Sequence, residues 1–315
     1  MSSQINVNDI SGLIPVRKPA GITSKDVSRV ITKRFGKIKL GHVGTLDPDA
    51  DGVLAVLVGR GTKLQDYLLD LPKAYSFEVT LGRSTDTMDA SGTTLKEHPW
   101  QHVNLQEMSK IIEKFKGPLS QTPPAYSAVK YQGKELYKYA RAGKSAEDLP
   151  LSELKRDVII YDLKLEYFDL PRIGLTVECS KGTYVRVLAT DMATALNTGG
   201  HVTRLTRTIS AGFSLESCVT LEQINDLNAT LDSLVIPMDQ LSIGLPTWIS
   251  SDMLALQRIV DGQCVVLDAA SFKAEPGSSS RNEVLAKSSN GRCIGIVEAI
   301  PIENGRMKLH MKRGL

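Results

Sequence analysis

Cysteine and histidine are scarce in this sequence, and neither is clustered. The chain holds four cysteines and five histidines among 315 residues. The cysteines lie far apart, without the C-x-x-C spacing of zinc and redox sites, and no secretory context favours disulfides. The histidines form no H-E-x-x-H pair. We therefore expect reduced, structural cysteines and a protein that binds neither a metal ion nor another cofactor.

Long apolar runs are also absent. No apolar stretch reaches the roughly 18 residues that suggest a membrane-spanning helix, and the opening residues MSSQINVNDISG lack the basic and apolar segments of a signal peptide. With 42% hydrophobic residues, the chain can still bury a sizeable core. These features predict a soluble, cytoplasmic protein with no membrane partner, and we expect it to act as a monomer.

Phosphate-binding loops are missing as well. The segment GRGTK at 59–63 combines glycines with a lysine. It satisfies neither the G-x-x-x-x-G-K-[ST] nor the G-x-G-x-x-G pattern, whose glycines bring backbone N–H groups close to a nucleotide. The sequence therefore argues against a nucleotide-binding protein.

Positive charge is concentrated in two segments, although the net charge is only +3. Residues 17–39 contain eight Lys or Arg and one acidic residue, Asp26. Residues 130–144 contain five Lys or Arg and one acidic residue, with Tyr131, Tyr137 and Tyr139 interleaved. Solvated helix faces also carry such runs. Basic side chains mixed with aromatic rings, however, suit a phosphate backbone and stacked bases, so two such segments favour nucleic acid as the partner.

Local patterns predict a mixture of helices and strands. Helices are expected at 22–36, with Thr23 or Ser24 as the cap and Gly36 as the end, and at 105–117 and 184–200. Strands are expected at 53–59 and 75–82, and as a pair at 155–170 and 173–180. Because no regular βαβ rhythm appears, we predict an α/β or α+β fold, with a mixed, largely antiparallel sheet and helices packed on it.

A break near the proline and glycine at 242–248 divides the chain into two predicted domains. Residues 1–242 would form the larger domain and residues 243–315 a small β-rich one. Strands are expected in this second part at 261–267, 282–288 and 293–300.

Three aspartates at alternate positions, Asp47, Asp49 and Asp51, precede Gly52. D-x-D-x-D-G is how a calcium-binding EF-hand loop begins, but that loop ends in a glutamate at its twelfth position, which here is Val58. Aspartates next to proline and glycine also stabilise turns through their own hydrogen bonds. The local sequence leaves open whether one of these carboxylates takes part in chemistry.

Four segments together resemble the TruB family of pseudouridine synthases, which modify the T-arm uridine of transfer RNA. They follow the family's order, and the resemblance spans Lys18 to about Arg207, roughly two thirds of the chain. The segments are VRKPAGITS (16–24), GHVGTLDPDADGVL (41–54) running on to GRGTKLQDYLLDLPKAYSFEVTLGRSTDTMDASG (59–92), PPAYSAVKYQGKELYKYARAG (123–143) and SKGTYVRVLATDMATALNTGGHVTRLTRT (180–208). The resemblance implies an isomerase that needs no cofactor and acts on the T-arm of transfer RNA, and a C-terminal domain similar to PUA RNA-binding domains.

The resemblance also implies a catalytic set. Asp47 would be the nucleophile or charge stabiliser, a role that suits a carboxylate at a glycosidic carbon. Arg186 would pair with Asp47 and orient it. Tyr75 would stack on the target base and take up a ribose proton, and Tyr184 would line the uracil pocket. Asp49 and Asp51 would only shape the turn or face solvent.

Three further residues would bind the substrate. A uridine inside a folded loop must be extruded before it can react, and His42 would fill the space that it leaves. Leu205 would contact the base, and Lys18, with the segment 130–144, would contact the RNA backbone. Two alternatives remain open: an N-glycosidase that releases uracil from RNA, and a non-catalytic RNA-binding or RNA-folding module.

Overall fold

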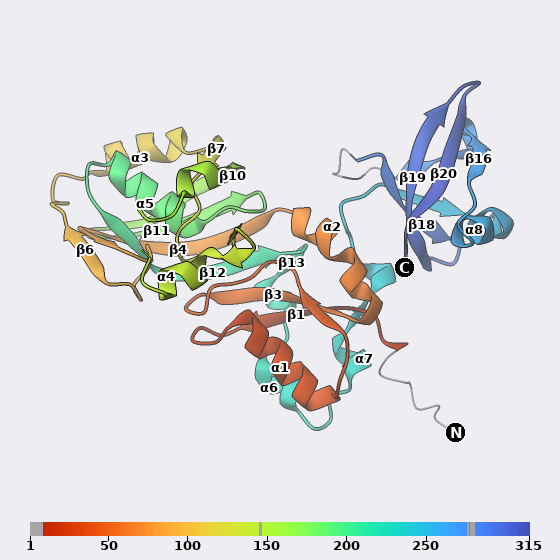
Figure 1. Ribbon diagram of the computed structural model, residues 1–315, viewed down its shortest axis with the longest axis horizontal. Coiled ribbons are helices and arrows are strands. Elements are labelled where there is room, and N and C mark those ends of the chain that lie inside the picture. The colour runs from red at the N-terminus through yellow and green to blue at the C-terminus, as the bar shows by residue number, and fades with distance from the viewer. Residues whose placement is uncertain (1–8, 145–146, 276, 278–280) are drawn as a thin grey trace.

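The computed structural model describes residues 9–144, 147–275, 277 and 281–315. In this part of the chain two large β-sheets occupy separate parts of the molecule (Figure 1). The larger sheet has ten strands in the order β14-β1-β3-β12-β4-β11-β10-β7, with β2 paired to β3 and β13 to β12. Its strands are β1 (Gly12–Lys18), β2 (Leu40–His42), β3 (Asp51–Val58), β4 (Lys73–Leu81), β7 (Gly117–Gln121), β10 (Arg156–Asp169), β11 (Arg172–Cys179), β12 (Gly200–Ser210), β13 (Phe213–Ser214) and β14 (Ile236–Pro237).

The larger sheet is mixed and largely antiparallel, so the predicted fold class is confirmed. Only β3 and β12 pair in parallel, whereas the other neighbours among the described strands of this sheet run antiparallel. The predicted pair of strands at 155–170 and 173–180 corresponds to β10 and β11. Two short hairpins lie outside the sheet: β5 (Arg83–Thr85) with β6 (Thr94–Glu97), and β8 (Lys130–Tyr131) with β9 (Lys134–Glu135).

The three predicted helices are present. The first, α1 (Ser24–Phe35), begins with a capping box in which Thr23 and Asp26 exchange hydrogen bonds, and it ends at Gly36. The others are α3 (Leu105–Lys114) and α5 (Val185–Ala195). None of the helices in the described ranges is long and apolar enough to cross a membrane. The remaining helices are α2 (Gln65–Asp70), α4 (Leu136–Arg141), α6 (Leu221–Asn225), α7 (Leu231–Leu234) and α8 (Met253–Val260).

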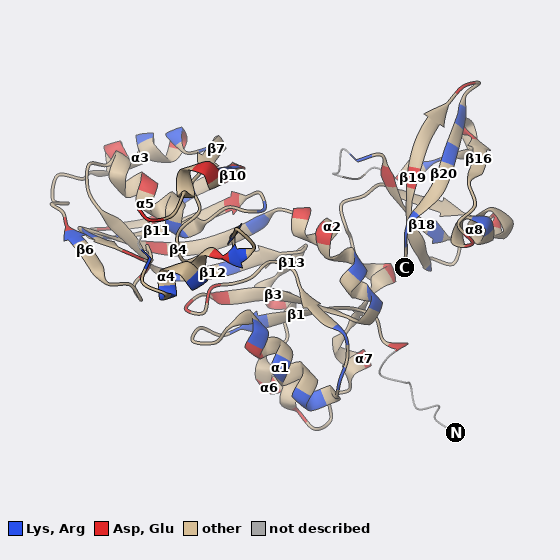
Figure 2. Ribbon diagram, in the orientation of Figure 1, with Lys and Arg blue, Asp and Glu red and all other residues tan. Residues whose placement is uncertain are grey.

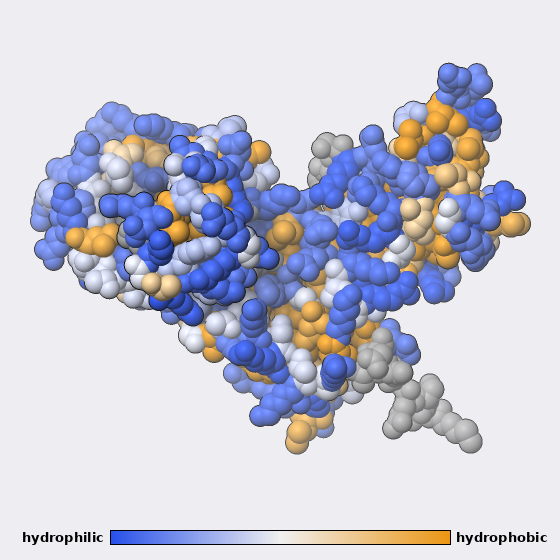
Figure 3. All heavy atoms as spheres, viewed as in Figure 1, coloured by the Kyte–Doolittle hydropathy of each residue, from blue (hydrophilic) through white to orange (hydrophobic). Residues whose placement is uncertain are grey.

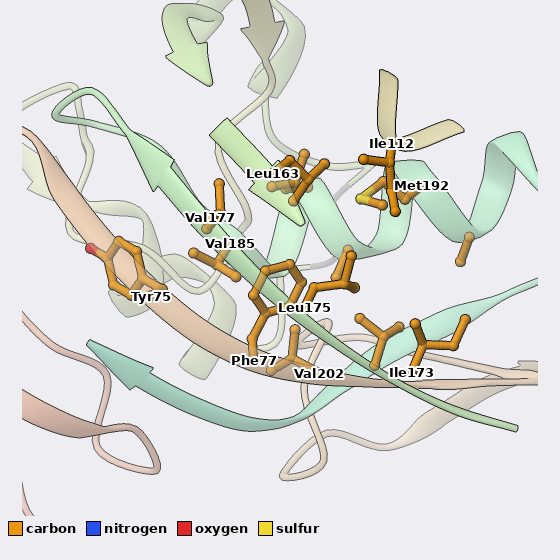
Figure 4. Close-up of a cluster of buried hydrophobic side chains, with 14 of the residues drawn as sticks. Tyr75, Phe77, Ile112, Leu163, Ile173, Leu175, Val177, Val185, Met192 and Val202 are labelled. Atoms are coloured by element: carbon orange, nitrogen blue, oxygen red, sulfur yellow. The ribbon is translucent and has the colours of Figure 1, made fainter. Parts of the chain in front are cut away.

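The largest apolar cluster lies where α3 and α5 pack on the larger sheet (Figure 4). Phe77 and Leu175 from neighbouring strands meet Met192 of α5 in this cluster. Burying side chains of this size contributes about 1.5–3 kcal/mol each. Tyr75 stands at one end of the cluster, with its hydroxyl directed away from the apolar side chains (Figure 4). The Tyr75 ring therefore lies at the margin of the core, two residues along β4 from the buried Phe77.

The C-terminal part of the chain forms a six-stranded sheet in the order β16-β20-β19-β18-β15-β17. The domain boundary predicted at 242/243 lies between the two sheets, yet a shared cluster joins them, in which Leu57 and Leu64 meet Ile296 and Leu315. The surface of the C-terminal part is partly apolar (Figure 3). Its strands are β15 (Thr247–Ser250), β16 (Val265–Asp268), β17 (Ala274–Glu275), β18 (Glu283–Ser288), β19 (Cys293–Ile302) and β20 (Arg306–Gly314).

Several strands were not predicted, among them β1, β20 and the central strand β12. Strand β12 runs between β3 and β4 and carries the buried Arg207. Irregular register between Val202 and Arg204, and again between Arg207 and Ile209, interrupts the alternation that a regular strand shows. The predicted site residue Leu205 lies on this strand.

Candidate active site

A cleft of about 600 Å³ brings together residues that are far apart in the sequence. Its lining comes from the loop before β3, from β4, from the segment leading into α5, and from β12. A second cavity of about 320 Å³ shares Asp47, Arg186 and Leu205 with the cleft. The cleft contains five of the seven predicted site residues, namely Asp47, Tyr75, Tyr184, Arg186 and Leu205.

Asp47 and Arg186 form an ion pair in the wall of this cleft. Arg186 Nε lies 2.9 Å from Asp47 Oδ2. The Arg186 side chain is 7% exposed, whereas that of Asp47 is 39% exposed. The guanidinium is thus packed into the protein, while part of the carboxylate stays open to a molecule in the cleft.

The other donors of Arg186 are also bound. Its Nη1 donates to the carbonyl of Thr87 at 2.7 Å and lies 3.3 Å from Asp89 Oδ2. Its Nη2 donates to the carbonyl of Tyr126 at 3.1 Å. Because all three nitrogens of the guanidinium are engaged by different groups, its direction toward Asp47 is fixed.

Asp89 is a site residue that the sequence analysis missed. Its Oδ1 accepts hydrogen bonds from the hydroxyls of Thr87 and Ser91, each at 2.6 Å, and its Oδ2 faces Arg186. The Asp89 carboxylate is therefore held in a turn by these hydrogen bonds, and its ion pair with Arg186 completes a chain Asp89–Arg186–Asp47. Its local sequence, TDTMDASG, lies in the second segment that resembles the family, but the residues alone indicate an ordinary turn and gave Asp89 no role.

The loop that carries Asp47 is fixed on both sides of this residue. On one side, Ser24 Oγ accepts a hydrogen bond from the Leu46 N–H at 3.0 Å and donates to the Leu46 carbonyl at 3.2 Å. On the other side, the carbonyl of Pro48 accepts from the Gly21 N–H at 2.9 Å and from Lys18 Nζ at 3.1 Å. The backbone around the carboxylate is thus fixed before any substrate arrives.

Arg207 supports the same loop from β12. It is 1% exposed, and it donates to the carbonyls of Gly44, Thr45 and Val53 at 2.8–3.3 Å. Gly52 is required beside it, because a Cβ at this position, where φ is +118°, would lie 2.3 Å from the Arg207 carbonyl oxygen.

The prediction that Lys18 contacts the RNA backbone is wrong. Lys18 is fully buried, and its ammonium group donates to the carbonyls of Pro19, Ile22 and Pro48 at 2.8–3.1 Å. All three of its donors are used inside the protein, so none is left for a phosphate. Its place in a basic segment suggested an exposed lysine, whereas the fold turns its side chain inward, where it binds the Asp47 loop.

Replacing Lys18 should change the pH dependence of stability. Burial lowers the pKa of Lys18 from 10.5 to about 8. Between these values the unfolded chain binds more protons than the folded one, so the stabilising contribution of Lys18 grows as pH rises. The unfolding free energy of wild type minus that of Lys18→Met, measured by urea denaturation, should therefore be more positive at about pH 9.5 than at about pH 7.5.

The exposed Lys25 on α1 provides a matched control for Lys18. A Lys25→Met variant should differ from wild type by the same small amount at both pH values. Lys73, another buried lysine whose pKa burial lowers to about 8, is present in every variant and cancels. Equal stability differences for Lys18→Met at the two pH values would contradict the lowered pKa of the buried Lys18 ammonium group.

Tyr75 faces Arg207 at the margin of the cleft. Burial raises the pKa of Tyr75 above its usual range, and the adjacent Arg207 guanidinium, which hydrogen-bonds to it, opposes this rise. The phenol therefore stays protonated near neutral pH. A neutral phenol with an aromatic face suits stacking on a base and hydrogen bonding to it.

Tyr184 is fixed through its backbone. The side chain of Gln121 accepts from the Tyr184 N–H at 2.9 Å and donates to the Tyr184 carbonyl at 3.3 Å. Its ring packs against a small apolar cluster that includes Val129 and Leu136, in the segment that follows β7. The basic segment 130–144 is thereby joined to the cleft, and its last residues, up to Lys144, lie within the described part of the chain.

His42 does not line either cavity. It lies on β2, and its Nε2 is 3.4 Å from the hydroxyl of Thr45, a residue of the cleft wall. Burial, together with Arg207 and Lys25, lowers the pKa of His42. A neutral histidine is therefore placed next to the Asp47 loop rather than inside the cleft.

The alternate aspartates do not form a calcium site. Asp51 Oδ1 accepts from the Thr206 hydroxyl at 2.5 Å, at the point where β3 and β12 pair, and Asp49 is exposed. No group of three or more His, Cys, Asp or Glu residues in the described ranges could hold a metal ion. Asp51 serves the strand pairing, and Asp47 alone of the three faces Arg186.

The structure places a carboxylate, paired with a buried arginine, in the wall of a cleft, and comparison with known proteins identifies the class and the family of the protein. The family model "TruB family pseudouridylate synthase (N terminal domain)" matches residues 32–185, and "tRNA pseudouridylate synthase B C-terminal domain" matches residues 186–242. The chain belongs to the TruB family of pseudouridylate synthases, enzymes that convert uridine to pseudouridine in transfer RNA. The predicted resemblance and enzyme class are confirmed.

Individual relatives agree with this assignment. The tRNA pseudouridine synthase B of Caldanaerobacter subterraneus subsp. tengcongensis is 42% identical over 81% of this chain and 86% of its own length. That of Bacillus subtilis is 37% identical over 95% of this chain and 96% of its own. Because these relatives are named as enzymes, the non-catalytic alternative loses its support.

Solved structures share the fold. A crystal structure of a Cbf5-Nop10-Gar1 complex contains a chain that superposes with a TM-score of 0.73 at 22% identity, covering 96% of this chain and 84% of that one. An H/ACA RNP bound to a substrate RNA containing 2'-deoxyuridine contains one with a TM-score of 0.71 at 20% identity, with the same coverage. At this identity the likeness establishes the architecture only.

Proposed function

We propose that this enzyme isomerises a uridine in the T-arm of transfer RNA, with Asp47 as the catalytic carboxylate. The observation that carries the proposal is the ion pair between Asp47 and Arg186, 2.9 Å long, on a loop held from both sides in the cleft wall. An ionised carboxylate is required because the reaction breaks an N-glycosidic bond and must capture or stabilise the electron-poor sugar carbon.

The bond changes of this reaction balance without a co-reactant. The N1–C1' bond breaks, the uracil turns, and a C5–C1' bond forms, while C5 loses a proton and N1 gains one. Neither oxidation nor net addition of water is involved. Asp47 would act at the sugar. Tyr75 would stack on the base, and its protonated hydroxyl would take up a ribose proton as it passes on its own, a transfer that is reversed before the product forms and so cancels in the balance. Tyr75→Phe, which removes only the hydroxyl, tests this second role through the rate of tritium release.

The target uridine must leave its stack to reach the cleft. Tyr184 and Leu205 would contact the extruded base from opposite segments of the wall, because both line the cleft. His42 would fill the gap in the RNA from its position beside Thr45. These three roles are proposed from position and residue type.

Two basic surfaces would hold the RNA backbone. Helix α1 exposes Lys25, Arg29 and Lys33, and α4 exposes Lys138 and Arg141, the latter 5.6 Å from the ring centroid of a tyrosine (Figure 2). Such contacts give affinity that falls with salt concentration and carry no sequence information of their own. The C-terminal sheet is proposed as an additional RNA-binding domain.

Incubation with transfer RNA transcripts labelled with tritium at uracil C5 tests the proposed substrate. The wild-type enzyme should release about one equivalent of tritium to water, since one C5–C1' bond forms per chain. When the T-arm uridines are replaced by cytidine one at a time, only one of the resulting transcripts, the one that lacks the target uridine, should release no tritium. Release that survives every T-arm replacement would contradict T-arm specificity, and free uracil among the products would favour the N-glycosidase alternative.

A further inference from the structure

One hydroxyl in the cleft wall has no role in the site described above. Ser127 is 6% exposed and lines the 600 Å³ cleft. Its Oγ is buried and has no hydrogen-bond partner among the residues that the structure describes. Buried hydroxyls in proteins are nearly always paired, and an exception at a binding cleft marks a place where a ligand can complete the hydrogen bonding.

The backbone around this hydroxyl is held in place. The Tyr137 N–H donates to the Ser127 carbonyl at 3.0 Å, and the preceding carbonyl, that of Tyr126, accepts from Arg186 Nη2 at 3.1 Å. Ser127 therefore follows directly on a backbone group bound by the arginine that orients Asp47. The guanidinium that pairs with Asp47 thus also holds the backbone next to Ser127.

The buried charged side chains of the cleft already donate their hydrogen bonds to groups of the protein. Arg186 serves two carboxylates and two carbonyls, and Arg207 serves three carbonyls. Lys73 Nζ donates to the carbonyls of Leu69 and Leu71. Ser127 thus supplies an uncommitted neutral donor in a wall whose buried charged donors hold the protein itself together.

We propose that the Ser127 hydroxyl binds the substrate by donating a hydrogen bond to a carbonyl oxygen of the extruded uracil. This proposal rests on the proposed reaction at Asp47. Uracil carries one carbonyl on each side of N3, and a half-turn about the axis through N3 and C6 exchanges N1 with C5 and one carbonyl with the other. A donor fixed beside this axis therefore meets a carbonyl oxygen both before and after the base turns. Ser127 therefore holds the detached base at the start and at the end of the turn, with a different carbonyl oxygen at each.

A pair of serine variants separates this role from a structural one. Ser210 is the matched control, because its Oγ is likewise buried without a partner among the described residues, yet it lines neither cavity. Ser127→Ala should lower kcat/KM by roughly 3- to 10-fold, as expected for one neutral hydrogen bond. Ser210→Ala should leave kcat/KM within about twofold of wild type. Neither variant should lower the melting temperature, because each removes an unsatisfied hydroxyl.

Thio-substituted RNA identifies the atom that Ser127 meets. Transcripts carrying 2-thiouridine or 4-thiouridine at the target replace one carbonyl oxygen at a time by sulfur, a weaker acceptor. With at least one of them, the loss caused by Ser127→Ala should shrink to less than about twofold, because the contact is already weakened. The proposal is overturned if Ser127→Ala keeps wild-type kcat/KM, if its effect is the same on all three substrates, or if it melts well below Ser210→Ala.

The failure of this proposal and the failure of the proposed reaction at Asp47 give different results. If Asp47→Asn retains activity, the reaction mechanism fails whatever Ser127→Ala does. If Asp47→Asn is inactive and Ser127→Ala behaves like Ser210→Ala, the mechanism stands and only the role of Ser127 is rejected.

Discussion

Asp47→Asn should reduce tritium release from C5-labelled transfer RNA by roughly a thousandfold or more, as expected when a catalytic nucleophile is lost. Asparagine keeps the shape of the side chain but removes the negative charge that must act at the sugar carbon. RNA binding, measured by filter retention, should stay within about threefold of wild type, since phosphate contacts come from other surfaces. The single-turnover rate of tritium release measures the chemical step, and filter retention measures RNA binding for the same variant.

The fold should survive this substitution. Arg186 keeps a second carboxylate, Asp89 Oδ2 at 3.3 Å, so its buried charge is not left alone. Asp49→Asn is the matched control, with the same chemical change on an exposed neighbour two residues away, and it should retain activity within about twofold. Full activity of Asp47→Asn, or equal losses in the two variants, would show that the carboxylate is not the catalytic group.

Elements with strong local signals were predictable from the sequence. Helix α1 has its capping residue, its apolar stripe and its terminal glycine in the chain itself, and the predicted limits match Ser24–Phe35 closely. Strand β12 was missed because two irregularities in register break its alternation and because a buried arginine, Arg207, stands where an apolar residue is expected. Only its pairing with β3 and β4 makes it a strand.

The active site was predictable only where the family resemblance reached. Asp47 and Arg186 were assigned as partners from motifs 139 positions apart, and they lie 2.9 Å from each other. Lys18 was assigned to RNA because basic residues surround it, whereas the hydrogen bonds that turn it inward involve carbonyls at residues 19, 22 and 48. Asp89 and Ser127 lie within resembling segments but were given no role, because the contact of Asp89 with Arg186 and the burial of the Ser127 hydroxyl in the cleft wall are visible only in the fold.

These contacts indicate why the site is stable despite its charges. Lys18, Arg186 and Arg207 are buried, and an unpaired buried charge would cost several kcal/mol. Each of the three spends its donors on carbonyls or carboxylates of the loops near Asp47. The same hydrogen bonds that stabilise the charges therefore also hold the loop rigid, so charge burial and preorganisation of the carboxylate have one structural cause.

Arg186→Lys should lower kcat/KM by about 100-fold or more, although it preserves the positive charge. An ammonium group offers three donors without the planar fork of a guanidinium, so it cannot serve Asp47, Asp89 and two carbonyls from one fixed position. Arg186→Met should be as inactive and less stable, by about 3–5 kcal/mol, because it leaves two carboxylates without their cation. Tritium release and urea denaturation measure the two effects separately.

Combining Asp89→Asn with Arg186→Lys shows whether the lost activity comes from a misoriented Arg186 side chain or from a change in charge alone. If Asp89 acts by orienting Arg186, Asp89→Asn should lower activity in the wild-type background and have little further effect in Arg186→Lys, since the contact is already lost. Arg172→Lys is the control, because Arg172 and Asp169 form an exposed pair at 3.5 Å whose loss should cost less than about 1 kcal/mol and no activity. Additive losses for Asp89→Asn and Arg186→Lys would mean that the two residues act independently, and the chain Asp89–Arg186–Asp47 would then not be the device that aims the carboxylate.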